Sequence, residues 1–302
     1  MILPSGHSDQ YLEDYLHGKI KQGYAIGVID LDAHLRYKQG QFNIINGADN
    51  VGKTIWVLWY FLCLSVRKGL KFCIWSGENK PEALERYLIE FLEGRKLKDM
   101  EQKNLHSAKA FIREHFKFVD HKKFYTNKDL YKVFQDAKVD ACLIDPFTGL
   151  DRNFTHADNY RFLNETRNFV NETGLTVYVN THPNSEAARS VYPDNFADKD
   201  LRGYQKPPSR SQSEGGQPFA NRCDEFITVH RYIGHPLLQY KTLIFIRKVK
   251  DTETGGIPTS IKDPVIFDWN SGLGFTCNNH NPISNALKPD GQLQDIKPNE
   301  RF

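Results

Sequence analysis

The sequence predicts an α/β fold: a mostly parallel, twisted sheet flanked by helices, with antiparallel strands at its C-terminal edge. Three observations predict it. A short strand at 41–46 leads through a glycine-rich loop into an apolar helix at 54–67. Strands and helices then alternate as far as position 183, which is typical of parallel strands joined by crossover helices. The last three apolar strands follow one another without helices, which favours antiparallel pairing at one edge of the sheet.

The individual elements follow from the periodicity of apolar residues and from capping signals. Residues 8–22 favour a short amphipathic helix, with Ser8 or Asp9 as its cap. Further helices are predicted over 54–67, 80–97 and 157–173, and strands over 41–46, 71–78, 139–146, 175–183, 223–232, 238–250 and 264–275. Residues 98–138 are expected to form helical and strand pieces, whereas the polar, serine-rich residues 184–218 indicate a long loop.

The chain divides into three predicted parts. Its 302 residues and 39% hydrophobic composition suit one large domain with a buried core. Residues 1–24 are expected to form an N-terminal helix and linker, and residues 25–275 the α/β domain. Residues 276–302 are polar, contain three prolines and lack apolar periodicity, so we expect a solvated, disordered tail.

The composition limits the classes of function. A net charge of +3 is too small for a polyelectrolyte, so any nucleic-acid contact has to come from a local patch. The five cysteines form no C-x-x-C pair and no metal-binding spacing, which is typical of reduced thiols. We expect no membrane span and no secretory signal, because no apolar stretch is long enough for either pattern. The predicted location is the cytoplasm, or the host cytoplasm if the chain is viral.

A phosphate-binding motif stands between the first strand and its helix. Residues 47–54, GADNVGKT, match G-x-x-x-x-G-K-[ST], in which the glycines let backbone N–H groups converge on phosphate oxygens. In this motif Lys53 supplies a positive charge to the β- and γ-phosphates, and the hydroxyl of Thr54 binds Mg²⁺. The helix that follows adds its positive N-terminus. We therefore predict a nucleoside triphosphate site at Gly47, Ala48, Asp49, Asn50, Val51, Gly52, Lys53 and Thr54.

Two strand-final carboxylates are candidate partners of this motif. Asp145 ends the apolar strand ACLI, where a second Mg²⁺ ligand is needed, although an aspartate there also suits a turn before Pro146. Glu78 ends the strand that follows the phosphate-binding helix, where a carboxylate can activate water. A surface glutamate that caps the helix beginning at Pro81 explains Glu78 equally well.

The ordered motifs resemble the ATPase domain of DnaB-type replicative DNA helicases, and most of all the Twinkle-like and phage primase-helicase branch of the hexameric RecA-like ATPases. The resemblance covers about residues 25–275 and depends on the order and spacing of the motifs. The motifs that carry it are GVIDLDAHLRYKQGQFNIINGADNVGKT, FCIWSGENKPEALERYL, ACLIDPF, TVYVNTHP, GGQPFANRCDEFITVHR and IRKVKDTETGG.

The resemblance implies roles for three residues and a set of partners. Glu78 corresponds to the family's catalytic glutamate, Asp145 to its Walker B aspartate, and His182 to the residue that senses the γ-phosphate. The implied cofactors are ATP and Mg²⁺. The implied partners are single-stranded DNA, five further copies of the chain in a homo-hexameric ring, and a separate primase or loader.

One motif departs from the family pattern. The family places an arginine finger two residues after a lysine, on a strand that reaches a neighbouring subunit's ATP. Here these positions hold Lys248 and Lys250, with Arg247 just upstream. Lysine lacks the planar fork of arginine. Four interpretations are open. Either Lys250 acts as a point-charge finger, or Arg247 has taken over the role of the finger, or catalysis between subunits is weak. In the fourth, the three residues are simply a solvated strand face.

The loop at 184–218 is the candidate DNA-binding segment. In the resembled family, loops after the later strands line the channel of the ring and grip single-stranded DNA. Basic residues around an aromatic one suit such contacts, although a disordered polar loop with balanced charges is the alternative interpretation. The candidate residues are Lys199, Arg202, Tyr204, Lys206 and Arg210.

The residues and the resemblance together favour an ATP-driven motor on single-stranded DNA, an ATPase with helicase activity in replication. A RecA-like recombination or repair ATPase is the second hypothesis. The third is a regulatory nucleotide-binding protein with weak hydrolysis, which the lysines at the finger position motivate.

Overall fold

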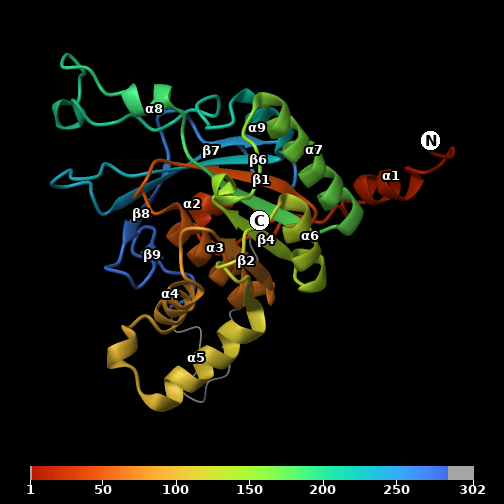
Figure 1. Ribbon diagram of the computed structural model, residues 1–302, viewed down its shortest axis with the longest axis horizontal. Helices are drawn as coiled ribbons and strands as arrows, with labels where there is room; N and C mark the ends of the chain where they lie inside the picture. The colour runs from red at the N-terminus through yellow and green to blue at the C-terminus, as the bar shows by residue number, and fades with distance from the viewer. Residues whose placement is uncertain (1, 285–302) are drawn as a thin grey trace.

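The computed structural model describes residues 2–284, which fold around a nine-stranded sheet (Figure 1). The strand order is β3-β2-β4-β5-β1-β6-β7-β8-β9. Six strands are parallel: β1 (Phe42–Asn46), β2 (Phe72–Ser76), β3 (Phe116–Phe118), β4 (Ala141–Asp145), β5 (Thr176–Thr181) and β6 (Glu225–His230). Antiparallel pairing then adds β7 (Lys241–Val249), β8 (Val265–Trp269) and β9 (Phe275–Thr276) at one edge. This arrangement confirms the predicted fold class.

Helices cover both faces of the sheet (Figure 1). One face carries α3 (Lys53–Lys68), α4 (Pro81–Glu93) and α5 (Gln102–His115), and the other carries α6 (Asn127–Asp136), α7 (His156–Thr173) and α9 (Gln217–Arg222). The remaining helices are α1 (Asp9–Leu16), α2 (Ile29–Asp32) and α8 (Ser185–Arg189), with 3₁₀ turns at Leu97–Asp99, Phe147–Gly149 and Lys199–Leu201.

The packing of helix α3 holds the loop between β1 and α3 in a fixed position. Its side chains are buried from Trp56 to Val66, because the helix lies between the sheet, α4 and the strands β8 and β9. Trp59, for example, packs edge-on against Phe267 and Phe275 with ring centroids 5.4 and 5.6 Å apart. Burial on all sides fixes the helix axis, and with it the position of the loop that precedes the helix.

Two terminal segments differ from the prediction. The first helix ends at Leu16 and buries none of its side chains, so it extends less far than residue 22 (Figure 1). Part of the segment 276–302, predicted to be a solvated tail, is packed, because Cys277 and Ile283 are buried against the α3 face of the core. Two apolar residues in a polar stretch are enough to anchor it. Residues 285–302 of the predicted tail lie outside the described residues.

The predicted loop at 184–218 is a folded segment. It contains α8, a 3₁₀ turn and the start of α9, and an isolated β-bridge joins Val191 to Gln205. Tyrosine side chains from the loop pack onto Tyr232, which lies just after β6. This aromatic packing supplies the apolar contacts that the serine-rich sequence does not reveal.

Between residues 2 and 284, no helix has both the length and the apolar character needed to cross a membrane. The five cysteines are buried and unpaired.

A buried carboxyl at the start of β6 makes stability depend on pH. Glu225 is fully buried, and neither carboxyl oxygen has a hydrogen-bond partner in the described part of the chain. Burial raises the pKa of Glu225 well above its usual value; Asp224 raises it further, and Lys38 opposes the rise. The folded state therefore favours the protonated carboxyl. A pKa that is raised on folding gives stability that is lost as pH increases.

We expect Glu225→Gln, which mimics the protonated carboxyl, to leave the melting temperature nearly unchanged near pH 4, below the ordinary pKa of glutamate, and to raise it progressively as the pH increases towards 9. Thermal melts of the wild type and the variant across this pH range measure the difference. Glu172→Gln, at an exposed position on α7, is the control. Parallel melting curves at all pH values contradict the prediction.

Candidate nucleotide-binding site

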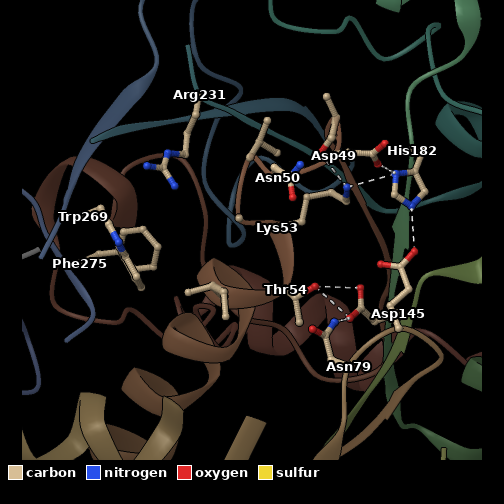
Figure 2. A pocket seen from close by; sticks show the side chains of 15 residues that line it. Asp49, Asn50, Lys53, Thr54, Asn79, Asp145, His182, Arg231, Trp269 and Phe275 are labelled. Atoms are coloured by element: carbon tan, nitrogen blue, oxygen red, sulfur yellow. Dashed lines mark hydrogen bonds and ion pairs between the residues drawn. The ribbon is translucent and has the colours of Figure 1, made fainter. Parts of the chain in front are cut away.

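A pocket of about 540 Å³ lies where the parallel strands end, the edge at which α/β sheets bind ligands (Figure 2). Residues at or just after the ends of five parallel strands contribute to it, so residues far apart in the sequence meet there. The lining residues are Ala48, Asp49, Asn50, Val51, Gly52, Lys53, Thr54, Ile55, Glu78, Asn79, Asp145, His182, Arg231, Trp269 and Phe275.

The loop from Gly47 to Thr54 requires glycine at two positions. A Cβ atom on Gly47 would lie 2.5 Å from the carbonyl oxygen of Val229, so no side chain fits there. Gly52 has φ +86°, a left-handed conformation that favours glycine, and it stands directly before α3. The loop thereby turns back over the N-terminus of a long helix, the position at which backbone N–H groups bind anions.

Lys53 is a buried cation held over this loop. Its ammonium donates to the carbonyl oxygens of Gly47 at 2.6 Å and Ala48 at 3.0 Å. Burial lowers the pKa of Lys53, while the nearby carboxylates of Asp145, Asp49 and Glu78 oppose this. A desolvated ammonium beside free helix N–H groups is suited to bind phosphate oxygens.

Thr54 and Asp145 bring hard oxygen ligands together below the loop. The hydroxyl of Thr54 lies 2.9 and 3.1 Å from the two carboxylate oxygens of Asp145 (Figure 2). Asp145 is buried and also accepts hydrogen bonds from Ser76 at 3.0 Å and from Asn180 at 2.6 Å, which fix its orientation. An aspartate used only to start a turn would not need these donors.

This oxygen pair fits Mg²⁺. Neighbouring ligands of an octahedral Mg²⁺ ion, with bonds of about 2.1 Å, lie about 3 Å apart. Within residues 2–284, no group of three or more His, Cys, Asp or Glu side chains could hold a metal ion by itself. Mg²⁺ usually takes one or two protein ligands and completes its shell with phosphate and water oxygens. Thr54 and Asp145 would hold the ion in that way.

His182 links two carboxylates at the phosphate end of the pocket. Its Nδ1 atom lies 2.9 Å from Oδ1 of Asp49 (Figure 2). Its Nε2 atom lies 3.7 Å from Oε1 of Glu78. Glu78 is 57% exposed and faces the pocket. The helix α4 has Lys80 as its N-cap and no side-chain capping bond, so Glu78 does not cap that helix. Its carboxylate is thus available to accept a proton from water.

The far end of the pocket contains residues that were not predicted. Trp269 from β8 and Phe275 from β9 pack together with ring centroids 4.8 Å apart (Figure 2). Arg231 follows β6, and its guanidinium is held by the carbonyl oxygen of Gln239 at 3.1 Å from Nε. The final arginine of the motif GGQPFANRCDEFITVHR was a usable signal for Arg231. No sequence pattern points to the two aromatic residues, because only the folding of β8 and β9 over α3 brings them to the loop.

The finger residues do not reach this pocket. They lie at the end of β7, which runs antiparallel to β6, so they stand beside the N-terminal end of β6. The pocket lies at the other end of the parallel strands, where their C-terminal residues are. The ammonium of Lys248 donates to the carbonyl oxygens of Ala220, Asn221 and Cys223, and so caps the end of α9.

The side chains of the two other finger candidates differ in how exposed they are. Arg247 packs over the ring of Phe245 at 4.1 Å and donates to the carbonyl oxygen of Pro208 at 3.2 Å. Burial lowers the pKa of Arg247 to about 10. The side chain of Lys250 is 66% exposed and lies 3.4 Å from Oδ1 of Asp224. Of the three, Lys250 is the side chain most open to a partner.

The candidate DNA residues fall into two groups. Lys199 and Arg210 are exposed. Tyr204 packs against Tyr232 and His235, Arg202 donates to the carbonyl oxygen of Phe196 at 2.8 Å, and Lys206 lies over the ring of Tyr192 at 5.7 Å. In the second group, Arg202 and Lys206 make contacts within the loop, and half-buried Tyr204 packs against residues that follow β6.

The chain has the fold of DnaB-like helicase ATPase domains. It is similar to a solved structure of the ATPase domain of G40P, with a TM-score of 0.70 and 13% sequence identity over 91% of this chain and 99% of that chain. It is also similar to a solved structure of a DnaB-like replicative helicase studied with primase, with a TM-score of 0.66 and 15% identity over 91% of this chain and 67% of that chain. No protein-family model and no curated protein matches the sequence.

Proposed function

We propose that this chain is an ATP-dependent motor on single-stranded DNA with helicase activity. One observation carries the proposal: Lys53, Thr54, Glu78, Asp145 and His182 converge on a single pocket at the edge of this sheet. The fold shared with helicase ATPase domains supports this class among the many proteins that carry a phosphate-binding loop.

The proposed chemistry is the hydrolysis of the γ-phosphate. Thr54 and Asp145 would hold Mg²⁺, which would supply positive charge against the phosphate oxygens. Lys53 and the N-terminus of α3 bind the phosphates. Glu78 accepts the proton of the attacking water, and His182 contacts the γ-phosphate end.

We assign the far end of the pocket to the nucleotide base. Trp269 offers an aromatic face, and Arg231 lies across from it (Figure 2). Because stacking of a base on an aromatic side chain is worth about 1–3 kcal/mol, Trp269→Ala is expected to raise the Kd for ATP and for ADP about tenfold. The turnover number at saturating ATP is expected to stay near that of the wild type.

Equilibrium titration with both nucleotides measures this effect. Trp269→Phe keeps an aromatic ring and is expected to restore most of the affinity. Phe124→Ala, at an aromatic residue that is 89% exposed and lies outside the pocket, is the control. Unchanged affinity in Trp269→Ala rules out the base assignment.

We propose further that the chain works as a hexameric ring in which Lys250 approaches the ATP of a neighbouring copy. Two observations support this: Lys250 is exposed, and it lies at the end of the strands opposite to the pocket. The helix α1 offers a second contact, since it exposes Tyr11, Leu12, Tyr15 and Leu16. The similarity to a helicase studied with primase motivates a primase partner. Light scattering with and without Mg²⁺-ATP tests the ring, and a monomer under both conditions contradicts it.

DNA contact is assigned to the folded loop at 184–218, through exposed Lys199 and Arg210. The loop begins at the same C-terminal strand ends that form the candidate nucleotide pocket, because it directly follows β5 and His182. Nucleotide-dependent movement of His182 can thus reach the loop over a short stretch of chain.

Two assays test the function. ATP hydrolysis is measured with and without single-stranded DNA, and strand separation is then measured on a forked duplex. Hydrolysis stimulated by DNA together with unwinding supports the proposal. Stimulation without unwinding points to a recombination or repair ATPase.

A nucleotide-binding protein with weak hydrolysis is the second candidate. The specific observation that favours it is the finger motif, in which Lys248 is used to cap α9 and no exposed arginine replaces it. ATP binding without measurable hydrolysis, with DNA present, selects this candidate.

A further inference from the structure

The aromatic end of the pocket stands on a short turn that two close contacts hold in place. The turn, residues 270–274, joins Trp269, the last residue of β8, to Phe275, the first residue of β9. Within it, the N–H of Asn270 donates to the carbonyl oxygen of Gly274 at 3.0 Å. The position of the turn therefore decides where the two aromatic rings lie.

The first contact comes from helix α3 and holds the Phe275 side of the turn. A Cβ atom on Gly274 would lie 3.0 Å from Cδ1 of Trp59, so the backbone of the turn lies directly on that indole. Gly274 has φ +102°, a conformation that favours glycine. Phe275 packs edge-on against the same indole, so this side of the turn belongs to the buried core.

The second contact comes from Lys96, in the segment after α4, and it holds the Trp269 side of the turn. The ammonium of Lys96 donates to the carbonyl oxygen of Gly272 at 3.1 Å. It also donates to Oε2 of the buried Glu90 at 3.1 Å, so the ammonium is held on two sides. A Cβ atom on Gly272 would collide with this ammonium and would lie 3.9 Å from Cζ2 of Trp269, so both side chains lie against the same glycine.

The charge of Glu90 keeps Lys96 in this position. The carboxylate of Glu90 is buried, and a buried charge needs a partner of opposite charge. Its Oε1 atom accepts the N–H of Leu97 at 3.2 Å, whereas the guanidinium of Arg86 lies 3.9 Å away. The ammonium of Lys96 is the closer cation, so its pairing with Glu90 directs it towards the turn.

We propose that Lys96 is a positioning residue for the base of the bound nucleotide: it holds the turn at Gly272 and so keeps the indole of Trp269 in place for stacking. The inference rests on the proposed function, because it assumes that the base stacks on Trp269. Lys96 does not line the pocket, and it acts only through the turn. Its loss should therefore weaken the contact with the base and leave the phosphate contacts of Lys53 and Thr54 unchanged.

The first test needs no nucleotide. Three of the four tryptophans, Trp56, Trp59 and Trp75, are at most 2% exposed, so quenching of tryptophan fluorescence by acrylamide reports mainly on half-buried Trp269. We expect Lys96→Met to raise the quenching constant, because release of the turn exposes this indole. Trp269→Phe removes the signal and so identifies it. Equal quenching in Lys96→Met and in the wild type overturns the proposal.

The second test compares ligands with and without a base. Calorimetric titrations measure the Kd of ATP, of ADP and of inorganic tripolyphosphate. We expect Lys96→Met to raise the Kd of both nucleotides about three- to tenfold, up to the loss expected for Trp269→Ala, and to leave the Kd of tripolyphosphate unchanged. An equal loss for all three ligands shows a general effect on the fold and overturns the proposal, and so does the absence of any loss.

A double variant checks that Lys96 acts through the indole. Residues that act as one unit give non-additive effects, so Lys96→Met combined with Trp269→Ala is expected to match Trp269→Ala alone. Additive losses contradict the proposal. Lys96→Arg keeps a charged donor and should restore most of the nucleotide affinity. Lys98→Met, at an exposed lysine of the same segment, is the control and should bind nucleotides like the wild type.

A further variant covers a loss of folding. Lys96→Met leaves the buried carboxylate of Glu90 without its closest cation, so it is also made together with Glu90→Gln, which removes that charge. Both proteins lack the bond to Gly272 and are expected to show the same loss of nucleotide affinity. Wild-type affinity in the folded double variant overturns the proposal.

The outcomes distinguish this inference from the proposed function. If the wild type binds neither nucleotide, the proposed function fails, while the quenching test still decides whether Lys96 holds Trp269. If the wild type binds both nucleotides and Lys96→Met binds them equally well, the nucleotide site stands and the role of Lys96 fails.

Discussion

Glu78→Gln is expected to lower the turnover number for ATP by about 10²- to 10⁴-fold, the usual contribution of a general base. Glutamine has nearly the same shape but cannot accept a proton from water. Because Glu78 is 57% exposed, the change removes no buried contact and is not expected to affect folding. ATP binding should persist, since Lys53, Thr54 and Asp145 are unchanged.

The measurement pairs a steady-state hydrolysis assay with a titration of ATP. Glu82→Gln is the matched control, because Glu82 is exposed in the first turn of α4 and does not line the pocket. It should hydrolyse ATP like the wild type. Turnover that survives in Glu78→Gln at the wild-type level shows that another group activates the water.

Lys53→Met is expected to weaken the binding of ATP about 10- to 100-fold, since a hydrogen bond to a charged group is worth about 1.5–3 kcal/mol. The same change should keep or raise the melting temperature. Burial lowers the pKa of Lys53, which means that the fold disfavours its charge, and methionine removes that charge at similar length.

Calorimetric titration and thermal melts measure the two effects in one protein. Lys68→Met, at the exposed C-terminal end of the same helix, should leave ATP affinity unchanged. A large fall in the melting temperature of Lys53→Met would mean that Lys53 stabilises the fold. An unchanged affinity of this variant for ATP would mean that Lys53 does not bind the nucleotide.

The fold could be predicted well because its signals are local. The alternation of strands and helices, the loop from Gly47 to Gly52 and the uninterrupted late strands each occur within a short stretch of sequence. The boundaries were less accurate. The helix predicted over 8–22 is α1, which ends at Leu16, and the segment predicted as a solvated tail from 276 includes the buried residues Cys277 and Ile283, because packing decides such details.

The candidate site was only partly predictable. Lys53 and Thr54 belong to a contiguous motif, and Asp145, Glu78 and His182 stand at strand ends that meet at one edge of a parallel sheet. Backbone periodicity is enough to place them on that edge. It does not give the distance from Nδ1 of His182 to Asp49, which depends on how the loop and β5 pack.

By itself, the sequence determined that this protein has a parallel sheet whose first strand leads into a loop with the phosphate-binding motif, because glycine conformation and apolar periodicity are properties of neighbouring residues. Only the tertiary structure decided that Lys248 caps α9, that Tyr204 packs against Tyr232 and that Trp269 lines the candidate nucleotide pocket. These roles depend on side chains separated by many residues, and contacts of that kind exist only once the sheet has brought its distant strands together.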